Sequence, residues 1–144
     1  VFQGEILGGC IDTLYDIFDT TRHEDSVSLC KKYALFPDLE DWKGKILLLE
    51  SSENQPNPEK YRTMLKALKQ SGIFEVLSGV LVGKPMDERY AKEYQEILPE
   101  VIGNPTLPIV FNLNVGHATP RAIIPFGIMA KVDVLVQRIS FTEA

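Results

Sequence analysis

The sequence is poor in the residues that build disulfide frameworks and metal centres. Among its 144 residues there are only two cysteines and two histidines. Cys10 and Cys30 do not form a CxxC pair, so the common zinc-binding cysteine motifs are excluded. So few thiols in a chain of this size predict a reduced, cytoplasmic protein, although the spacing is also compatible with one disulfide.

Positive charge and long apolar runs are scarce as well. Fifteen basic residues stand against 20 acidic ones, which gives a net charge of -5 and argues against a nucleic-acid partner. No apolar run approaches the roughly 20 residues that span a bilayer, and no signal peptide is visible, so no membrane partner is expected. With 44% hydrophobic and 24% charged residues, the composition is that of one ordinary globular domain.

Short apolar runs that alternate with helical patterns predict a layered α/β domain. Asn57 and Asp87 are predicted to cap two of the helices. Alternating strands and helices favour a largely parallel central sheet. Strands are expected at 4–9, 46–49, 76–82 and 108–113, helices at 11–18, 26–34, 58–71 and from 88 to 101, and a β-rich tail at 123–141.

Two polar residues follow buried strands of this predicted sheet. Glu50 ends one apolar run, and His117 follows another in the segment Asn114–Pro120, NVGHATP. Parallel strands place their carboxyl ends at one edge, where ligands of open α/β sheets bind. A carboxylate that accepts from one ring nitrogen leaves the other free as a general base. We therefore expect Glu50 within about 2.6–3.2 Å of one His117 nitrogen, and the second nitrogen facing an open surface without a partner.

Plainer interpretations exist for each residue, and the pair lacks a nucleophile. A lone histidine is more often a turn residue, and a lone carboxylate more often solvates a strand end. Other candidates for the chemistry are weak. Ser51 and Ser52 adjoin the acid and lie in no G-x-S-x-G elbow, and Cys10 is expected to pack at the start of a helix. The spacing of Glu53 from Glu50 is not specific for the carboxylate pair of a glycosidase, and His23 is expected in a solvated loop. No third residue is suitably spaced to complete a metal site.

Four segments carry a family resemblance: GEILGGCIDTL, GKILLLESSENQP, LVGKP and FNLNVGHATPRAIIPFG. In this order they resemble the C-terminal half of the LD-carboxypeptidase family, which includes muramoyl-tetrapeptide carboxypeptidases and microcin C immunity proteins. The resemblance covers nearly the whole chain. Segment 19–39 fits it less well, as an insertion would.

The resemblance implies a swivelling β/β/α fold and a serine peptidase with a Ser-Glu-His triad. By motif, Glu50 and His117 take the acid and base positions. No position matches the serine motif, which the family carries in an N-terminal domain. Residues 1–144 are thus expected to form a single domain, the C-terminal part of a longer protein, and the start at Val1 without a methionine agrees with this. The nucleophile domain would be missing and the isolated chain inactive.

The family's activity implies hydrolysis of an amide bond in a murein peptide or a related peptide antibiotic. The implied partners are a small peptide substrate, the missing domain and, as family members often pair, a second copy. No metal or organic cofactor is implied. Two rival hypotheses remain: a non-catalytic ligand-binding domain built around Glu50 and His117, and a self-sufficient hydrolase that uses Ser51, Ser52 or Cys10.

Overall fold

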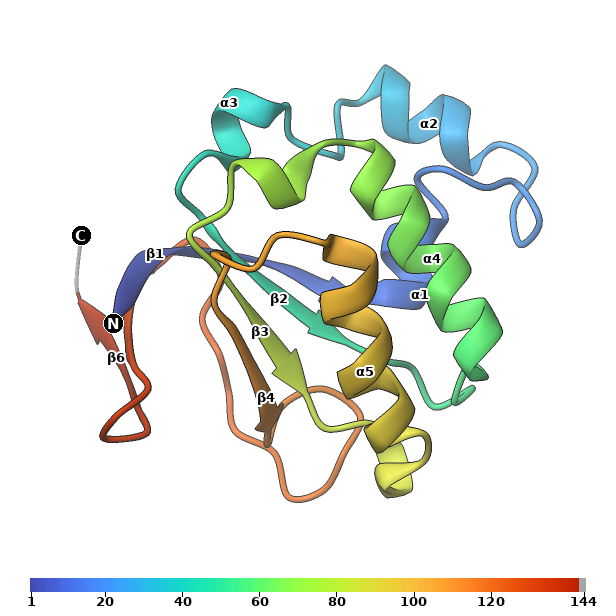
Figure 1. Ribbon diagram of the computed structural model, residues 1–144. Helices are drawn as coiled ribbons and strands as arrows, with labels where there is room; N and C mark the ends of the chain where they lie inside the picture. The colour runs from blue at the N-terminus through green and yellow to red at the C-terminus, as the bar shows by residue number, and fades with distance from the viewer. Residues whose placement is uncertain (143–144) are drawn as a thin grey trace.

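The computed structural model, which describes residues 1–142, contains a six-stranded sheet in the order β4-β3-β2-β1-β5-β6 (Figure 1). Four adjacent strands run parallel: β1 (Phe2–Cys10), β2 (Ile46–Glu50), β3 (Gly79–Gly83) and β4 (Ile109–Leu113). β5 (Met129–Asp133) and β6 (Arg138–Thr142) add an antiparallel hairpin beside β1. The α/β class and the largely parallel sheet are confirmed.

The two long helices, α4 (Pro58–Gln70) and α5 (Ala91–Ile102), lie across the same face of the sheet (Figure 1). The start of α4 is the predicted one, because the Asn57 side chain accepts a hydrogen bond from the Lys60 backbone N–H at 2.9 Å. Shorter helical segments complete the chain: α1 (Ile11–Tyr15), α2 (Ser26–Lys32), α3 (Leu39–Trp42), η1 (Ile73–Glu75) and η2 (Met86–Glu88).

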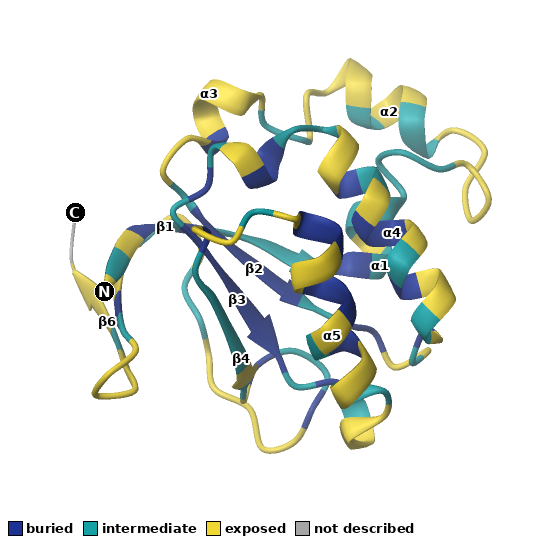
Figure 2. Ribbon diagram, viewed as in Figure 1, coloured by how far each residue is buried: buried dark blue, intermediate teal, exposed yellow. Residues whose placement is uncertain are grey.

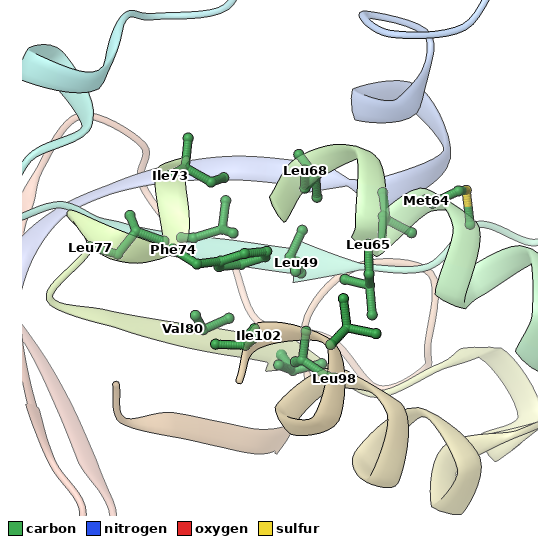
Figure 3. Packing of buried hydrophobic residues seen from close by; sticks show 14 of the residues in the cluster. Leu49, Met64, Leu65, Leu68, Ile73, Phe74, Leu77, Val80, Leu98 and Ile102 are labelled. Atoms are coloured by element: carbon green, nitrogen blue, oxygen red, sulfur yellow. The ribbon is translucent and has the colours of Figure 1, made fainter. Parts of the chain in front are cut away.

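Alternation along β2 divides the interior into two cores. Leu47 and Leu49 face the helices, where they pack in a large cluster with side chains of α4, η1 and α5 (Figure 3). Ile46 and Leu48 face the other side and join a smaller cluster with Val115. β2 and β3 are buried along nearly their whole length (Figure 2), as continuous apolar strands covered on both faces should be.

Some predicted boundaries are wrong, for local reasons. Asp87 does not cap α5, because its carboxylate accepts from Gln55 Nε2 at 3.0 Å and the helix begins only at Ala91. β3 begins at Gly79 instead of residue 76, after the turn η1. The one-turn helix α3, which the sequence analysis did not predict, is capped by the Asp38 side chain on the Asp41 N–H at 3.0 Å.

Within residues 1–142, no helix combines the length and the apolarity needed to cross a bilayer.

Candidate active site

The carboxyl ends of the parallel strands gather the polar groups of the candidate site. Cys10 ends β1 and Glu50 ends β2, and the two residues are direct partners in the strand register. His117 lies in the segment after β4, a strand that β3 separates from β2 in the sheet. The expected meeting of strand ends at one edge is therefore confirmed.

Glu50 and His117 are hydrogen-bonded to each other. Glu50 Oε2 lies 2.7 Å from His117 Nδ1 and also accepts the His117 backbone N–H at 3.3 Å. The Glu50 side chain is largely buried, whereas about a third of the His117 side chain is exposed. One carboxylate oxygen thus fixes both the ring and its backbone, and the predicted separation is confirmed.

Gly116 allows the turn to pass directly over the carboxylate. Its φ is +86°, and a Cβ at this position would lie 2.5 Å from Glu50 Oε2. Any side chain would therefore collide with the acid in a backbone conformation that already disfavours one. Arg121 adds support, because its Nη1 donates to the Gly116 carbonyl at 3.1 Å. The glycine before the histidine is needed for the close approach of the acid.

The second ring nitrogen has a partner, which corrects one expectation. His117 Nε2 lies 3.0 Å from Glu53 Oε2, where an open surface without a partner was predicted. The Glu53 side chain is mostly exposed and belongs to the loop after β2, so local chain geometry brings both carboxylates to one imidazole. The hydrogen bond that the His117 ring donates to Glu50 is the main reason that the pKa of His117 is raised above its ordinary value. Coulombic attraction to Glu50 and then Glu53 raises this pKa further, while burial and the charge of Arg121 lower it.

The two serines beside Glu50 are buried and structural. Ser51 and Ser52 are each about 5% exposed or less. The Ser52 backbone N–H donates to Asp12 Oδ2 at 3.1 Å, and its Oγ accepts from the Asn54 N–H at 3.2 Å. A hydroxyl in this setting is closed to a substrate, which argues against a self-sufficient serine hydrolase.

Cys10 lies closer to the pair than the sequence analysis expected. Its Sγ, a Glu50 carboxylate oxygen and a His117 ring nitrogen all lie within 4.8 Å of one another. A third potential metal ligand is therefore present, although no sequence spacing indicated one. Burial is the main cause that raises the pKa of the Cys10 thiol to about 11, so it is protonated at neutral pH and a poor nucleophile. Cys10 and Cys30 are both free thiols.

Two small hollows flank the Glu50–His117 pair. One, of about 210 Å³, is lined by His117, Thr119 and the segment 84–88. The other, of about 220 Å³, is lined by Glu50 and mostly apolar neighbours that include Ile124 and Phe126. A larger hollow of about 440 Å³, between β4 and the β5–β6 hairpin, contains neither residue of the pair. Each flanking hollow is smaller than a usual ligand pocket.

Neither Asp12 nor the contact made by Glu53 was predicted from the sequence. Asp12 lies in the first turn of α1, where an acidic residue is commonly a helix-end feature, yet its carboxylate holds the backbone of the loop after β2. His23 is exposed in a loop, as expected. The sequence shows that Glu53 closely follows Glu50, but only the folded path of the loop after β2 shows that the Glu53 side chain reaches His117.

Comparison with solved structures extends these observations. An MccF-like protein from Streptococcus pneumoniae, in complex with AMP, is 60% identical over 98% of this chain and 41% of that chain, with a TM-score of 0.95. MccF in complex with glutamyl sulfamoyl guanosine is 22% identical over 99% of this chain and 38% of that chain, at a TM-score of 0.75. A muramoyltetrapeptide carboxypeptidase from Oxalobacter formigenes is 21% identical over 96% of this chain and 43% of that chain, at a TM-score of 0.68. The last two likenesses concern the fold alone.

The chain spans about two fifths of the length of these solved proteins. No curated protein sequence matches it. A family model described as the LD-carboxypeptidase C-terminal domain matches residues 3–132, which is most of the chain. The chain therefore belongs to the LD-carboxypeptidase family and corresponds to its C-terminal domain.

Proposed function

We propose that this chain supplies the acid and the base of a Ser-Glu-His triad, and that the nucleophilic serine belongs to a separate N-terminal domain of the same protein. Glu50 is the acid and His117 the base. The observation that carries the proposal is the 2.7 Å contact between Glu50 Oε2 and His117 Nδ1 at the carboxyl edge of the sheet. The match to a peptidase family supplies the reaction class.

In the proposed reaction, Nδ1–H donates to Glu50, and Nε2 removes the proton of the serine hydroxyl as its oxygen attacks the substrate carbonyl. The imidazolium then gives this proton to the leaving nitrogen as the amide bond breaks. Water, activated in the same way, hydrolyses the acyl-enzyme and restores the serine. Glu50 stabilises the positive charge that His117 carries in each transition state.

Glu53 occupies the position that the serine hydroxyl would take at Nε2. Because the Glu53 side chain is 63% exposed, it can leave without opening either core. We therefore assign it the role of a replaceable partner that yields when the nucleophile domain is in place. The two hollows beside the pair, each too small for a complete ligand, also fit a site that a second domain completes.

The substrate class that we favour is an acyl group joined by an amide-type bond to a nucleotide. The 60% identical relative was solved with AMP, and more distant MccF structures contain aspartyl or glutamyl sulfamoyl nucleosides. A murein tetrapeptide is the second candidate, because the matching family model is that of the LD-carboxypeptidases.

The test is turnover by the full-length protein, measured by mass spectrometry with glutamyl sulfamoyl adenosine and with a murein tetrapeptide. We expect hydrolysis of the nucleoside substrate, and no turnover of either substrate by the 144-residue chain alone, because removing one triad member commonly costs several orders of magnitude. Turnover by the isolated chain would contradict the proposal. Ligand binding by the full-length protein without hydrolysis of either compound would favour the binding-domain hypothesis instead.

A further inference from the structure

Cys10 forms a three-donor cluster with the Glu50–His117 pair, and the proposed peptidase chemistry gives it no role. The three donor atoms come from the end of β1, the end of β2 and the segment after β4. All lie within 4.8 Å of one another. Sulfur, imidazole nitrogen and carboxylate oxygen together form a donor set typical of zinc, and three protein ligands with one open position are common in zinc sites.

The geometry needs little adjustment to hold an ion. Around a tetrahedral Zn²⁺, donor atoms lie about 3.4–3.6 Å apart, given Zn–S and Zn–N or Zn–O bonds of about 2.3 and 2.1 Å. The distance of 2.7 Å between Glu50 Oε2 and His117 Nδ1 would increase as the ion replaces the proton between them. The Cys10 side chain would rotate to bring its Sγ toward these two atoms. The His117 side chain is about a third exposed and Cys10 is only partly buried, so an ion can enter from solvent on their side of the cluster.

Glu53 provides the supporting contact that a histidine ligand requires. If Nδ1 binds the ion, the neutral ring carries its proton on Nε2, which lies 3.0 Å from Glu53 Oε2. Histidine ligands usually donate their second N–H to a carboxylate or carbonyl group in this way. The charges also balance, since one thiolate and one carboxylate neutralise Zn²⁺. Binding releases the thiol proton of Cys10 to the solvent.

We propose that Cys10, Glu50 and His117 form a binding site for Zn²⁺, or a similar thiophilic divalent ion, that competes with the use of His117 as a base. The binding part of this proposal is independent of the peptidase hypothesis. Its consequence, reversible inhibition by Zn²⁺, rests on the proposed function, because an imidazole bound to the metal through Nδ1 can no longer donate to Glu50 and stabilise the imidazolium.

Binding is tested directly on the 144-residue chain by calorimetric titration with Zn²⁺ and by absorption spectroscopy with Co²⁺. We expect one ion per chain and a thiolate-to-cobalt charge-transfer band. Cys10→Ser and His117→Ala should each lower the affinity for Zn²⁺ by at least about 100-fold, since even loss of an outer partner commonly costs 10–100-fold. Cys30→Ser and His23→Ala are the matched controls and should bind as the unmodified chain does.

A second measurement does not depend on the folding of any variant. Zn²⁺ should protect Cys10, but not Cys30, of the unmodified chain from alkylation by iodoacetamide, as located by peptide mass spectrometry. Absence of stoichiometric binding, a charge-transfer band that persists in Cys10→Ser, or equal alkylation of Cys10 with and without Zn²⁺ would each overturn the proposal. If Zn²⁺ binds as expected but does not inhibit the full-length enzyme, the proposed zinc site is correct and the proposed role of His117 as the catalytic base is wrong.

Discussion

The two faces of the sheet are covered in different ways. On one face, α4 and α5 lie over a cluster of nineteen buried apolar residues. On the other, the segment 114–128 and the β5–β6 hairpin cover only seven, and apolar side chains such as Ile123 and Phe126 stay exposed. Backbone hydrogen bonds between Ile6 and the segment 127–128 tie this thin cover to β1.

Because the two faces are covered differently, one face contributes mainly to stability and the other positions the candidate active site. The helical face contributes most of the buried apolar area, and hence most of the hydrophobic stabilisation. The loop-covered face places His117 against Glu50, through a turn that Arg121 supports and that buries Val115 in the smaller cluster. Substitutions in the core of the helical face should therefore change mainly the free energy of unfolding, whereas substitutions of Glu50 and His117 should change mainly turnover.

The largest expected effect is on turnover and comes from the pair itself. In the full-length protein, Glu50→Gln should lower kcat by roughly 10⁴-fold, and His117→Ala by at least as much, because both residues act mainly on charge that develops in the transition state. KM should change little. Steady-state kinetics measure both quantities, and His23→Ala, in an exposed loop, is the control. A near-native kcat in either variant would show that the substituted residue does not have the proposed catalytic role.

Leu65→Ala should have the largest effect on stability. Leu65 lies on the buried face of α4 and is fully buried, and removing a buried leucine side chain typically costs about 2–5 kcal/mol in the free energy of unfolding. Chemical denaturation measures this loss, while kcat at low temperature should be retained. Ile123→Ala, on the loop-covered face, removes a side chain that is 94% exposed and should change stability by no more than about 0.5 kcal/mol. Equal losses in the two variants would erase the contrast between the faces.

Gly116→Ala should affect both quantities, with a smaller loss of stability. The added Cβ would lie 2.5 Å from Glu50 Oε2, and the strained backbone costs about 1–3 kcal/mol. Turnover should fall because the acid and the ring are pushed apart. Gly127→Ala is the matched control, since its φ is +71° but a Cβ there meets nothing within 4 Å. It should lose some stability and keep its turnover, as measured by the same two assays.

The smallest expected effect is a shift in pH dependence. Attraction to Glu53 is one of the causes that raise the pKa of His117. Glu53→Gln removes part of the stabilisation of the imidazolium, so the pKa falls and the neutral base persists to lower pH. NMR titration of the imidazole in the 144-residue chain, where Glu53 contacts Nε2, should therefore show a lower pKa for His117 in the variant. Glu24→Gln, in an exposed loop, should leave the pKa of His117 unchanged, and a higher pKa of His117 in Glu53→Gln would contradict this sign.

The sequence was sufficient to predict the sheet and the Glu50–His117 contact. Apolar runs of strand length defined the parallel strands, and the carboxyl ends of such strands necessarily meet at one edge. The cap at Asn57 was predictable because it depends only on residues four positions apart or fewer. These features follow from local pattern and from general rules of topology.

The features that could not be predicted depend on specific tertiary contacts. Cys10 joins the pair because the register sets it opposite Glu50, and no local pattern encodes the register of two distant strands. Asp87 has the composition of a helix cap, but its carboxylate is engaged by Gln55, 32 positions away. Glu53 reaches Nε2 only through the path of the loop after β2.

The central claim, that His117 and Glu50 activate a serine outside this chain, is tested most directly by covalent labelling of the full-length protein with a fluorophosphonate. The account predicts one adduct, on a serine outside residues 1–144, and a labelling rate that falls by orders of magnitude in His117→Ala but not in His23→Ala. An adduct on Ser51 or Ser52, or a labelling rate that is unchanged in His117→Ala, would contradict it.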